Sequence, residues 1–390
     1  MRAADRAARR RVLVVVGTRP EAIKMAPVLR ALQQAEATEV RLVLTGQHSD
    51  LVGEVLETFS LRPDWDLDIM KDNQTLAGVG QECLGGMARI LGEWPPDMVL
   101  VQGDTASVFF SSLAAFLRGD VAIGHVEAGL RTGNLRQPFP EEAFRRLTAV
   151  LADLHFAPTP GARDNLLREG VPADRIHLTG NTGVDALLEV ERMAKAPSSP
   201  ILQRLILPGA PPFLLLTAHR RESFGGGLER VFRAVRALVD ESPELEVLFP
   251  VHPNPAVVDP ARRVFEGAER IHTVAPLAYS DLVAAIRQAR AVLTDSGGIQ
   301  EEAPTFGTPV LILRDVTERP EGIQAGVARL VGTDPDRITH EVRRILKAPS
   351  SERIRLRKAN PYGDGRAGPR IAEAVTTFLE KRHSIGGRPA

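Results

Sequence analysis

Short apolar runs alternate with amphipathic stretches along nearly the whole chain, and this alternation is the strongest constraint on the fold. The apolar runs predict strands at residues 11–17, 39–46, 97–104, 121–127, 153–158, 175–180, 213–220, 246–252, 270–276, 291–298, 309–315 and 328–334. Continuous apolar strands separated by helices are typical of parallel sheets that are covered on both faces. The sequence therefore predicts an α/β protein.

A second feature divides this alternation into two halves. Residues 191–212 are rich in proline and serine, which favours a linker. A chain of 390 residues is also too long for one ordinary core. We therefore expect two Rossmann-like, doubly wound domains that face each other across a cleft, at residues 1–190 and 213–367. Residues 368–390 are expected to form a C-terminal helix, with packing back on the N-terminal domain as one option.

The charge balance and the cysteine content argue against several classes of protein. The 49 basic and 49 acidic residues give a formal net charge of zero, so we expect neither a nucleic acid nor a membrane as partner. Cys83 is the one cysteine, which rules out an intramolecular disulfide and fits a reducing compartment. No apolar stretch approaches the roughly 18–20 residues of a membrane helix, so we expect a cytoplasmic protein.

The signatures of common metals and cofactors are also missing. The nine histidines and the cysteine show no HxH, HExxH or CxxC spacing, so no catalytic metal is expected. The stretch GTRPEAIK at residues 17–24 is neither GxGxxG nor a Walker A loop. We therefore expect no dinucleotide cofactor and no nucleoside triphosphate hydrolysis.

In doubly wound folds, ligands bind at the carboxyl ends of the strands, so polar residues directly after a predicted strand are site candidates. In TDSGGIQEE, the residues Ser296, Gly297 and Gly298 follow a strand and precede a helix. Glycines let the backbone approach a ligand, and a helix start offers N–H groups, so this turn suits a pyrophosphate. Glu302, one turn later, can accept hydrogen bonds from ribose hydroxyls. The alternative is an ordinary glycine-containing turn.

Basic residues follow two other predicted strands. Arg19 and Lys24 place cations at a helix start, which the helix dipole disfavours unless an anion lies between them. The alternative is a solvated pair of side chains. His219, in TAHRRES, can donate to a phosphate or protonate a leaving oxygen. The alternative for this histidine is a purely structural role.

Three carboxylates are candidates for proton transfer. Glu127 directly follows the strand VAIGHV, and Asp104 ends the strand in QGDTAS. Asp104 is also a candidate helix N-cap, since aspartate is favoured at that position. In PEEAFRR, Glu141 and Arg145 are four residues apart, so Arg145 can hold Glu141 ionised. The same spacing also fits an exposed pair that contributes only about 0.3–0.5 kcal/mol.

Taken in order, these stretches resemble the non-hydrolysing UDP-N-acetylglucosamine (UDP-GlcNAc) 2-epimerase family. The matching motifs, between about residues 12 and 380, are GTRPEAIKMAP, GHVEAGLRTG, PEEAFR, TGNTGVDAL, TAHRRES, TDSGGIQEEAP, RDVTERPEG and NPYGDGRA. The resemblance implies a glycosyltransferase-B-type fold, usually a homodimer, in the bacterial cytoplasm, without a metal or a nicotinamide cofactor. It also implies reversible conversion of UDP-GlcNAc to UDP-ManNAc, by elimination of UDP to 2-acetamidoglucal and re-addition.

The family's functional positions coincide with the candidates above. By this resemblance, Asp104, Glu127 and Glu141 are the acid/base residues, while Arg145 and His219 orient a carboxylate or contact the diphosphate. The resemblance also implies a set of residues that bind the nucleotide of the UDP-sugar, namely Arg19, Lys24, Ser296, Gly297, Gly298 and Glu302.

Two positions depart from the family pattern. Relatives commonly read EExNR where this chain has Phe144, so we expect altered packing at an otherwise intact motif. Some relatives read KDRQT, whose arginine helps to bind a second, activating UDP-GlcNAc, where this chain has Asn73. Gln47 and His48, in TGQH, remain as candidate residues for that allosteric site.

Three other functions stay open on the sequence alone. A hydrolysing epimerase would release free ManNAc and UDP, and its bifunctional versions carry a sugar-kinase domain for which we expect no room in 390 residues. A glycosyltransferase of the same fold would need an acceptor site, for which no motif is evident. A catalytically silent nucleotide-sugar sensor would have no need of three proton carriers.

Overall fold

The computed structural model describes residues 9–46, 49–71, 74–193, 195–220 and 223–384. These residues form two compact units. The first unit runs up to Ala186 and resumes at Gly363, and the second comprises Leu187–Tyr362. Each unit is built around its own sheet.

The first unit contains a seven-stranded parallel sheet in the order β3-β2-β1-β4-β5-β6-β7. Its strands are β1 (Arg10–Val16), β2 (Thr38–Leu44), β3 (Trp65–Asp66), β4 (Met98–Gln102), β5 (Ala122–Val126), β6 (Leu154–Ala157) and β7 (Ile176–Leu178). Strands β4 and β5 are buried along their whole length. Burial on both faces explains why these strands read as continuous apolar runs in the sequence.

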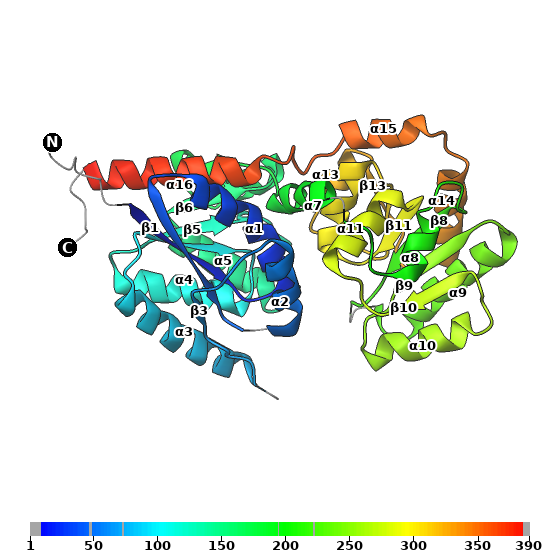
Figure 1. The fold of residues 1–390 in the computed structure, drawn as a ribbon, viewed down its shortest axis with the longest axis horizontal. Coiled ribbons are helices and arrows are strands. Elements are labelled where there is room, and N and C mark those ends of the chain that lie inside the picture. The colour runs from blue at the N-terminus through cyan, green and yellow to red at the C-terminus, as the bar shows by residue number, and fades with distance from the viewer. Residues whose placement is uncertain (1–8, 47–48, 72–73, 194, 221–222, 385–390) are drawn as a thin grey trace. The chain divides into compact units, whose positions relative to one another are not determined.

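Helices cover both faces of this sheet. They are α1 (Arg19–Gln34), α2 (Ser49–Thr58), α3 (Leu76–Glu93), α4 (Ala106–Arg118), α5 (Glu141–Leu151), α6 (Pro160–Arg168), the first part of α7 (Thr182–Met193) and α16 (Ala367–Ser384), with a short 3-10 turn at Ala173–Arg175. Helices α1 and α16 pack together on one face, and α3, α4 and α5 pack on the other (Figure 1). On that second face, Leu13, Val99 and Ile123 of the sheet share a core with Met87 of α3 and Phe144 of α5.

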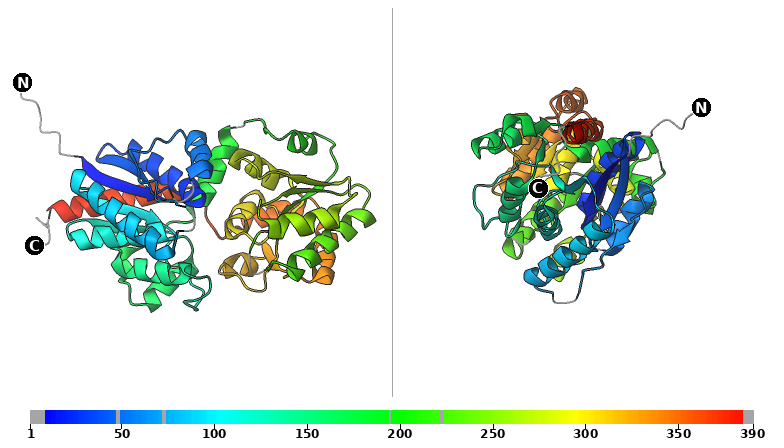
Figure 2. Two further views of the ribbon diagram at one scale, coloured as in Figure 1. Left: turned by 90° about the horizontal axis from the view of Figure 1, so that it is seen from below. Right: turned by 90° about the vertical axis from the view of Figure 1, so that its left-hand side faces the viewer.

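The last helix, α16, returns the chain to the first unit. Its side chains Ile371, Val375 and Leu379 are buried, and β1 and α16 lie in the same unit in Figure 2. Gly368 approaches α1 so closely that a Cβ atom there would lie 2.8 Å from the carbonyl oxygen of Pro27. The first unit is therefore assembled from both ends of the chain.

The second unit contains a six-stranded parallel sheet in the order β10-β9-β8-β11-β12-β13. Its strands are β8 (Phe213–Thr217), β9 (Glu246–Pro250), β10 (Ile271–Val274), β11 (Ala291–Thr294), β12 (Val310–Ile312) and β13 (Ala328–Leu330). Its helices are α8 (Pro200–Leu205), α9 (Gly226–Glu241), α10 (Pro255–Phe265), α11 (Tyr279–Gln288), α12 (Gly297–Glu302), α13 (Pro320–Gln324), α14 (Pro335–Leu346) and α15 (Ser351–Lys358), with a 3-10 turn at Ala303–Phe306. Leu216 and Leu293 of the sheet meet Phe232 of α9 in its core.

Every strand predicted from an apolar run is present, so the α/β prediction is confirmed. The sequence analysis missed β3, because it has two residues and lies in the polar stretch RPDWDLD. The segment expected to be a linker also differs, since it contains α8. Ser199 caps this helix, and Leu202 and Leu205 are buried, so the segment packs as part of the second unit.

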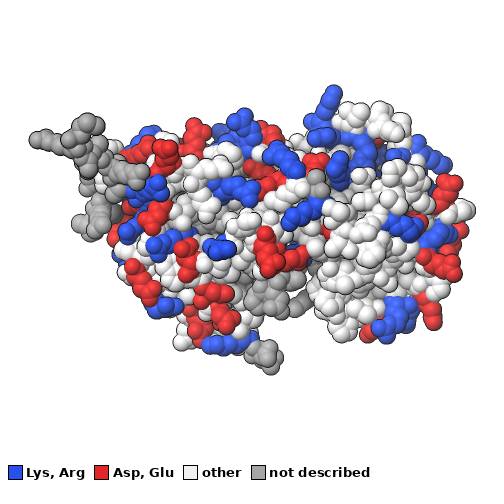
Figure 3. Space-filling model, in the orientation of Figure 1, with Lys and Arg blue, Asp and Glu red and all other residues white. Residues whose placement is uncertain are grey.

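Charged side chains of both signs are mixed over the visible surface of each unit (Figure 3). This mixing agrees with the formal net charge of zero and leaves no broad field of one sign on that face. Among the helices that the structure describes, none has the length and apolar character needed to cross a bilayer.

Candidate active site

The first group of candidates lies where the first sheet reverses its winding. The chain continues from β1 to β2 on one side and from β4 to β5 on the other, so the turns after β1 and β4 flank the switch point at which such folds bind ligands. Gly17 follows β1 in a tightly packed turn. A Cβ atom at Gly17 would lie 2.5 Å from Ser107 Oγ and 2.7 Å from Thr45 Oγ1, so this turn accepts only glycine.

Glu127 follows β5 directly, in a left-handed backbone conformation with a φ of 63°. This conformation costs a residue with a side chain roughly 1–2 kcal/mol. Gln102 Nε2 donates to Glu127 Oε2 at 2.6 Å, and Lys24 Nζ forms an ion pair with the same oxygen. The Lys24 and Glu127 side chains are each only 10% exposed, so solvent screens this pair weakly. The carboxylate of Glu127 thus supplies an anion beside Lys24.

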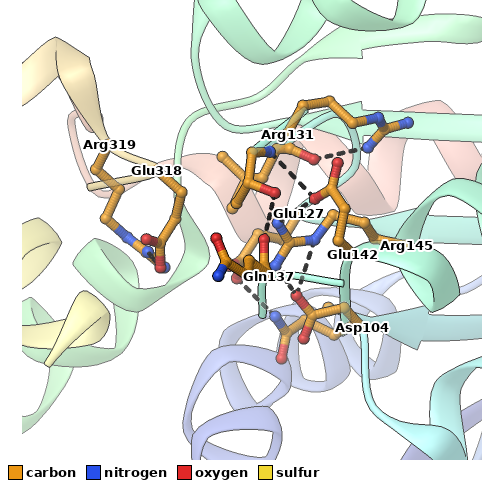
Figure 4. Close-up of polar contacts among 12 residues, drawn as sticks. Asp104, Glu127, Arg131, Gln137, Glu142, Arg145, Glu318 and Arg319 are labelled. Atoms are coloured by element: carbon orange, nitrogen blue, oxygen red, sulfur yellow. Dashed lines mark hydrogen bonds and ion pairs between the residues drawn. The ribbon is translucent and has the colours of Figure 1, made fainter. Parts of the chain in front are cut away.

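Arg145 of α5 joins two other carboxylates (Figure 4). Its Nε donates to Asp104 Oδ2 at 3.0 Å, its Nη2 donates to the same oxygen, and its Nη1 donates to Glu142 Oε2 at 2.9 Å. The i,i+4 spacing suggested Glu141 as the partner of Arg145, whereas the structure pairs Arg145 with Glu142, three residues away. The guanidinium therefore fixes the position of Asp104 from a second element.

The N-cap interpretation of Asp104 is wrong. Thr105 occupies the cap position of α4, where its hydroxyl accepts from the backbone N–H of Val108 at 3.4 Å. The Asp104 carboxylate is held by Arg145 instead, and its side chain is 27% exposed. An oriented and partly accessible carboxylate of this kind can exchange a proton with a bound molecule.

Glu142 was not singled out by the sequence analysis. Its side chain is fully buried, and it accepts from the backbone N–H groups of Thr132 at 3.1 Å and Gly133 at 3.3 Å. These hydrogen bonds connect the segment after β5 to α5, and they fix the carboxylate of Glu142 that binds Arg145. The sequence does show Glu142, as the second acid of PEEAFR. Because residues three and four apart both share a helix face, the spacing could not tell whether Arg145 pairs with Glu141 or with Glu142.

Glu141 is the first residue of α5. Its Oε2 atom is buried and accepts no hydrogen bond from any residue that the structure describes. A buried carboxylate oxygen without a donor is uncommon in folded proteins, and a catalytic role is one physical reason to retain it.

Burial shifts the proton affinity of two groups beside this cluster. His125 on β5 is fully buried, which lowers its pKa to about 3, although the Gly103 carbonyl oxygen lies 2.8 Å from its Nε2 and favours the protonated ring. Burial also raises the pKa of Glu21, on α1, to about 7, and hydrogen bonds from Gly17 and Thr105 oppose that rise. At neutral pH, His125 is therefore uncharged and Glu21 titrates.

The second unit repeats the same plan, with β8 and β11 adjacent where its sheet reverses winding. Thr217 Oγ1 donates to Thr294 Oγ1 at 2.6 Å, which joins the ends of these two strands. The next residue, Asp295, is fully buried and accepts from the backbone N–H groups of His219 at 2.7 Å and Arg220 at 2.8 Å. The backbone of His219 and Arg220 is thereby fixed beside the Ser-Gly-Gly turn.

The His219 imidazole lies within this arrangement. Its Nδ1 is 3.3 Å from Asp295 Oδ1, and its ring stacks on His252 with centroids 5.5 Å apart. Burial lowers the pKa of His219, while the charge of Asp295 opposes that change. The ring is therefore neutral at pH 7, and a side chain that is 37% exposed can donate to an anion or pass on a proton.

The predicted Ser-Gly-Gly turn forms the start of α12, with Ser296 at the N-cap position and Gly297 and Gly298 as the first two residues of the helix. A Cβ atom on Gly297 would lie 2.5 Å from Arg319 Nη1, so glycine lets the guanidinium pack on the backbone. At Gly298 a Cβ atom would meet no described atom within 4 Å, which leaves room for a ligand against the backbone. Glu302 is 8% exposed and accepts from the Tyr279 hydroxyl at 3.3 Å.

Arg319 also anchors a buried ionic network that sequence reasoning did not assign. Its Nε donates to Glu301 Oε1 at 2.6 Å, and it pairs with Glu318 (Figure 4), to which Arg314 Nη1 donates at 2.9 Å. Burial alone would raise the pKa of Glu318, but the charges of Arg319 and Arg314 outweigh it and hold that pKa at about 2. The motif RDVTERPEG contains three of these charged residues, but its spacing does not reveal which side chains form ion pairs.

Comparison with known proteins identifies the family. The family model for UDP-N-acetylglucosamine 2-epimerase matches residues 30–376. The chain is 46% identical over 365 residues to UDP-N-acetylglucosamine 2-epimerase of Bacillus subtilis, covering 94% of each chain. It is 46% identical over 371 residues to the enzyme of Escherichia coli strain K12, covering 94% of this chain and 98% of that one.

The chain belongs to the UDP-N-acetylglucosamine 2-epimerase family. A solved structure of UDP-GlcNAc 2-epimerase from Neisseria meningitidis, bound to UDP-GlcNAc, is 39% identical. It matches with a TM-score of 0.86 over 94% of this chain and all of that one. The resemblance inferred from the ordered motifs is therefore confirmed, and so is the fold class that it implied.

The two departures from the motifs of the 2-epimerase family have different outcomes. Phe144 is buried on α5, where its ring stacks on Phe109, with centroids 5.2 Å apart, and meets Phe110 edge-on at 5.9 Å. Phe144 thus belongs to an aromatic cluster between α4 and α5. Asn73, Gln47 and His48, the residues considered for an allosteric site, lie outside the described residues.

Proposed function

We propose that this protein interconverts UDP-GlcNAc and UDP-ManNAc without net hydrolysis, by eliminating UDP and adding it back. One observation carries this proposal beyond family membership. The first unit gathers three candidate carboxylates at the ends of β4 and β5 and at the start of α5, each in a different electrostatic setting. Inversion of a carbon that bears hydrogen needs more than one proton carrier.

The chemistry explains this requirement. C2 of the sugar has no adjacent carbonyl group, so its proton is weakly acidic and cannot be removed alone. Breaking the C1–O bond to UDP as that proton leaves gives 2-acetamidoglucal, with the bonding electrons departing on the diphosphate. UDP then adds back at C1 while a proton arrives at C2 from the opposite face. The protein must therefore supply a base on one face, an acid on the other, and charge stabilisation for the departing UDP.

We assign the proton carriers to Asp104, Glu127 and Glu141. Lys24 and Gln102 favour the ionised form of Glu127, and an ionised carboxylate can accept a proton. Arg145 orients the carboxylate of Asp104 through its guanidinium. Glu141 contributes an oxygen that carries no internal hydrogen bond among the described residues.

We assign binding of the nucleotide to Arg19 and Lys24 in the first unit and to the Ser-Gly-Gly turn and Glu302 in the second. The open space at Gly298 supports an approach of phosphate oxygens to the backbone there. The His219 side chain is 37% exposed, so its ring can reach a bound diphosphate and donate a hydrogen bond to it. The Neisseria relative bound to UDP-GlcNAc supports the choice of ligand.

We also propose a homodimer in the cytoplasm. Four apolar side chains are exposed on the adjoining helices α4 and α5, at Phe116, Leu117, Leu147 and Val150. Exposed apolar clusters of this kind favour association between protein chains. The buried free thiol of Cys83 suits a reducing compartment. Sedimentation of the full chain tests the dimer, and a monomer at micromolar concentration would contradict it.

The activity is tested by incubating the protein with UDP-GlcNAc in D2O and following the sugar by NMR. We expect UDP-ManNAc to appear and deuterium to enter C2 of both UDP-sugars. Free ManNAc formed in step with UDP would indicate a hydrolysing epimerase. Sugar transfer to an added acceptor without epimerisation would indicate a glycosyltransferase. Binding without any exchange at C2 would indicate a sensor.

A further inference from the structure

Glu21 is a buried carboxyl group in the first unit that the proposed reaction does not use. It lies in the first turn of α1, with a residue exposure of 3%. Its Oε2 accepts from the backbone N–H of Gly17 at 2.6 Å, and its Oε1 accepts from the Thr105 hydroxyl at 2.8 Å. One side chain therefore joins the turn after β1 to the turn after β4, where Thr105 directly follows Asp104.

The hydrogen bonds of Glu21 fit both of its protonation states. When the carboxylate is ionised, Gly17 and Thr105 both donate to it. When Oε1 is protonated, it can donate to Thr105 Oγ1, while Oε2 still accepts from Gly17. The geometry of the two turns can thus persist while the charge beside Asp104 changes by one unit.

Asp104 lies close enough to Glu21 for a change in the charge of Glu21 to act on it. Among the described residues, the charged group that acts on Glu21 from the β4–α4 turn is Asp104, and its negative charge favours protonated Glu21. From α3, the buried Cys83 thiol also feels the charge of Glu21. Lys24, one turn further along α1, is engaged by Glu127. Burial places the pKa of Glu21 at about 7, so its charge changes in the range where enzymes of neutral compartments work.

We propose that Glu21 is a positioning residue that ties the turn after β1 to the turn carrying Asp104 and, by gaining or losing its own charge, changes the electrostatic field at that turn. The kinetic part of this inference rests on the proposed role of Asp104 in proton transfer. An ionised Glu21 places a second negative charge beside the Asp104 carboxylate, and the two like charges repel each other. A protonated Glu21 removes that effect.

The variant Glu21→Gln tests the charge while keeping the shape. A glutamine can accept from Gly17 through its carbonyl oxygen and donate to Thr105 through its amide, so it imitates the protonated form. We expect the wild-type profile of kcat/KM against pH to show an inflection near pH 7, and the Glu21→Gln profile to lack it. An unchanged inflection in Glu21→Gln would overturn the proposal.

Thr105 offers a matched pair of variants. Its hydrogen bond lowers the pKa of Glu21, so Thr105→Ala should move the inflection to higher pH, while Thr105→Ser keeps the hydroxyl and should leave it in place. A purely structural link would predict lower activity in Thr105→Ala at every pH, with no displacement of the inflection.

Thermal unfolding separates this inference from the proposed function. The folded chain keeps a proton on Glu21 up to about pH 7, whereas the unfolded chain loses it near pH 4.5, so this group's stabilisation falls as pH rises through that window. The melting temperature of Glu21→Gln relative to wild type should therefore rise between pH 4.5 and pH 7. This readout holds whether or not the protein epimerises UDP-GlcNAc. A difference in melting temperature that is constant with pH would refute the titration of Glu21.

Discussion

Arg145 is the side chain on which the order of the carboxylates in the first unit most depends. Its side chain is only 7% exposed, and its guanidinium binds Asp104 on one side and Glu142 on the other. Glu142 also accepts hydrogen bonds from two backbone N–H groups, which fix its position. The guanidinium that binds it therefore has little freedom to rotate away from Asp104. Glu141, one residue before this clamp, keeps a carboxylate oxygen that no described donor occupies. Neighbouring acids on one helix turn thus differ in their contacts, since Glu142 holds Arg145 while the buried Oε2 of Glu141 accepts no hydrogen bond among the described residues.

Replacing Glu141 by glutamine should therefore affect turnover more than binding. We expect Glu141→Gln to lower kcat by about 10²–10⁴-fold, the usual contribution of a general acid or base, because the amide cannot exchange a proton at C2. The affinity for UDP, measured by calorimetry, should stay near that of the wild type. Turnover close to wild type would remove Glu141 from the mechanism.

His125 gives a prediction about stability and pH. Its pKa is about 3 in the folded protein and about 6.5 when unfolded, so the unfolded chain binds a proton that the folded chain does not between those values. The free energy of unfolding should then fall by roughly 1.4 kcal/mol per pH unit as the pH drops from 6.5 toward 3. His125→Gln can still donate to the Gly103 carbonyl oxygen, and its urea-unfolding curves should show a shallower loss across this range. Equal slopes for the two proteins would contradict the assignment.

At the scale of elements, the aromatic cluster decides how α5 sits on its neighbours. Phe144 of α5 stacks on Phe109 of α4, and Phe110 of α4 packs so close to Gly80 of α3 that a Cβ atom there would lie 2.4 Å from the ring. The aromatic rings thereby hold α3, α4 and α5 together, and α5 is the helix that carries Arg145. An asparagine at position 144 could not make these ring contacts.

Truncating Phe144 should therefore loosen α5. We expect Phe144→Ala to cost about 3–5 kcal/mol of stability, as for other buried phenylalanines, and to lower kcat because Arg145 loses its support. Chemical denaturation measures the first effect, and the NMR assay measures the second. Ile354→Ala is a control, because this side chain is 61% exposed on α15 and should change stability by less than about 0.5 kcal/mol.

Elements of this kind could be predicted from the sequence, whereas most contacts between them could not. Apolar runs located every long strand, because burial on both faces leaves a continuous signal along the chain. The two-residue strand β3 leaves no such signal. The partner of Arg145 and the burial of Glu21 depend on how α5 and α1 are rotated against the sheet, which spacing along the chain does not encode. Positions at strand ends, such as Glu127, were predictable because the topology alone places them there.

At the scale of the whole molecule, the first unit depends on a helix from the far end of the chain. Gly368 N donates to Asp185 Oδ1 at 2.8 Å, Arg382 donates to the carbonyl oxygen of Asp120 at 3.1 Å, and α16 packs along α1. Burial of its three aliphatic side chains, Ile371, Val375 and Leu379, contributes roughly 1.5–3 kcal/mol each of hydrophobic free energy to the first unit.

Deleting residues 367–390 should therefore unfold or severely weaken the first unit and leave the second largely intact. Hydrogen exchange followed by mass spectrometry can report on the two units separately. We expect faster exchange in β1, β4 and α1 and unchanged exchange in β8, β11 and α9. Equal acceleration in both units would show that their stabilities are coupled.

The return of α16 also sets an order of events during synthesis. The ribosome synthesises every residue of the second unit before it synthesises α16, the helix that completes the first unit. The surface of α1 that α16 covers therefore stays uncovered in the nascent chain until residues 367–384 have been synthesised. The unit that begins the chain is in this sense the last to be completed.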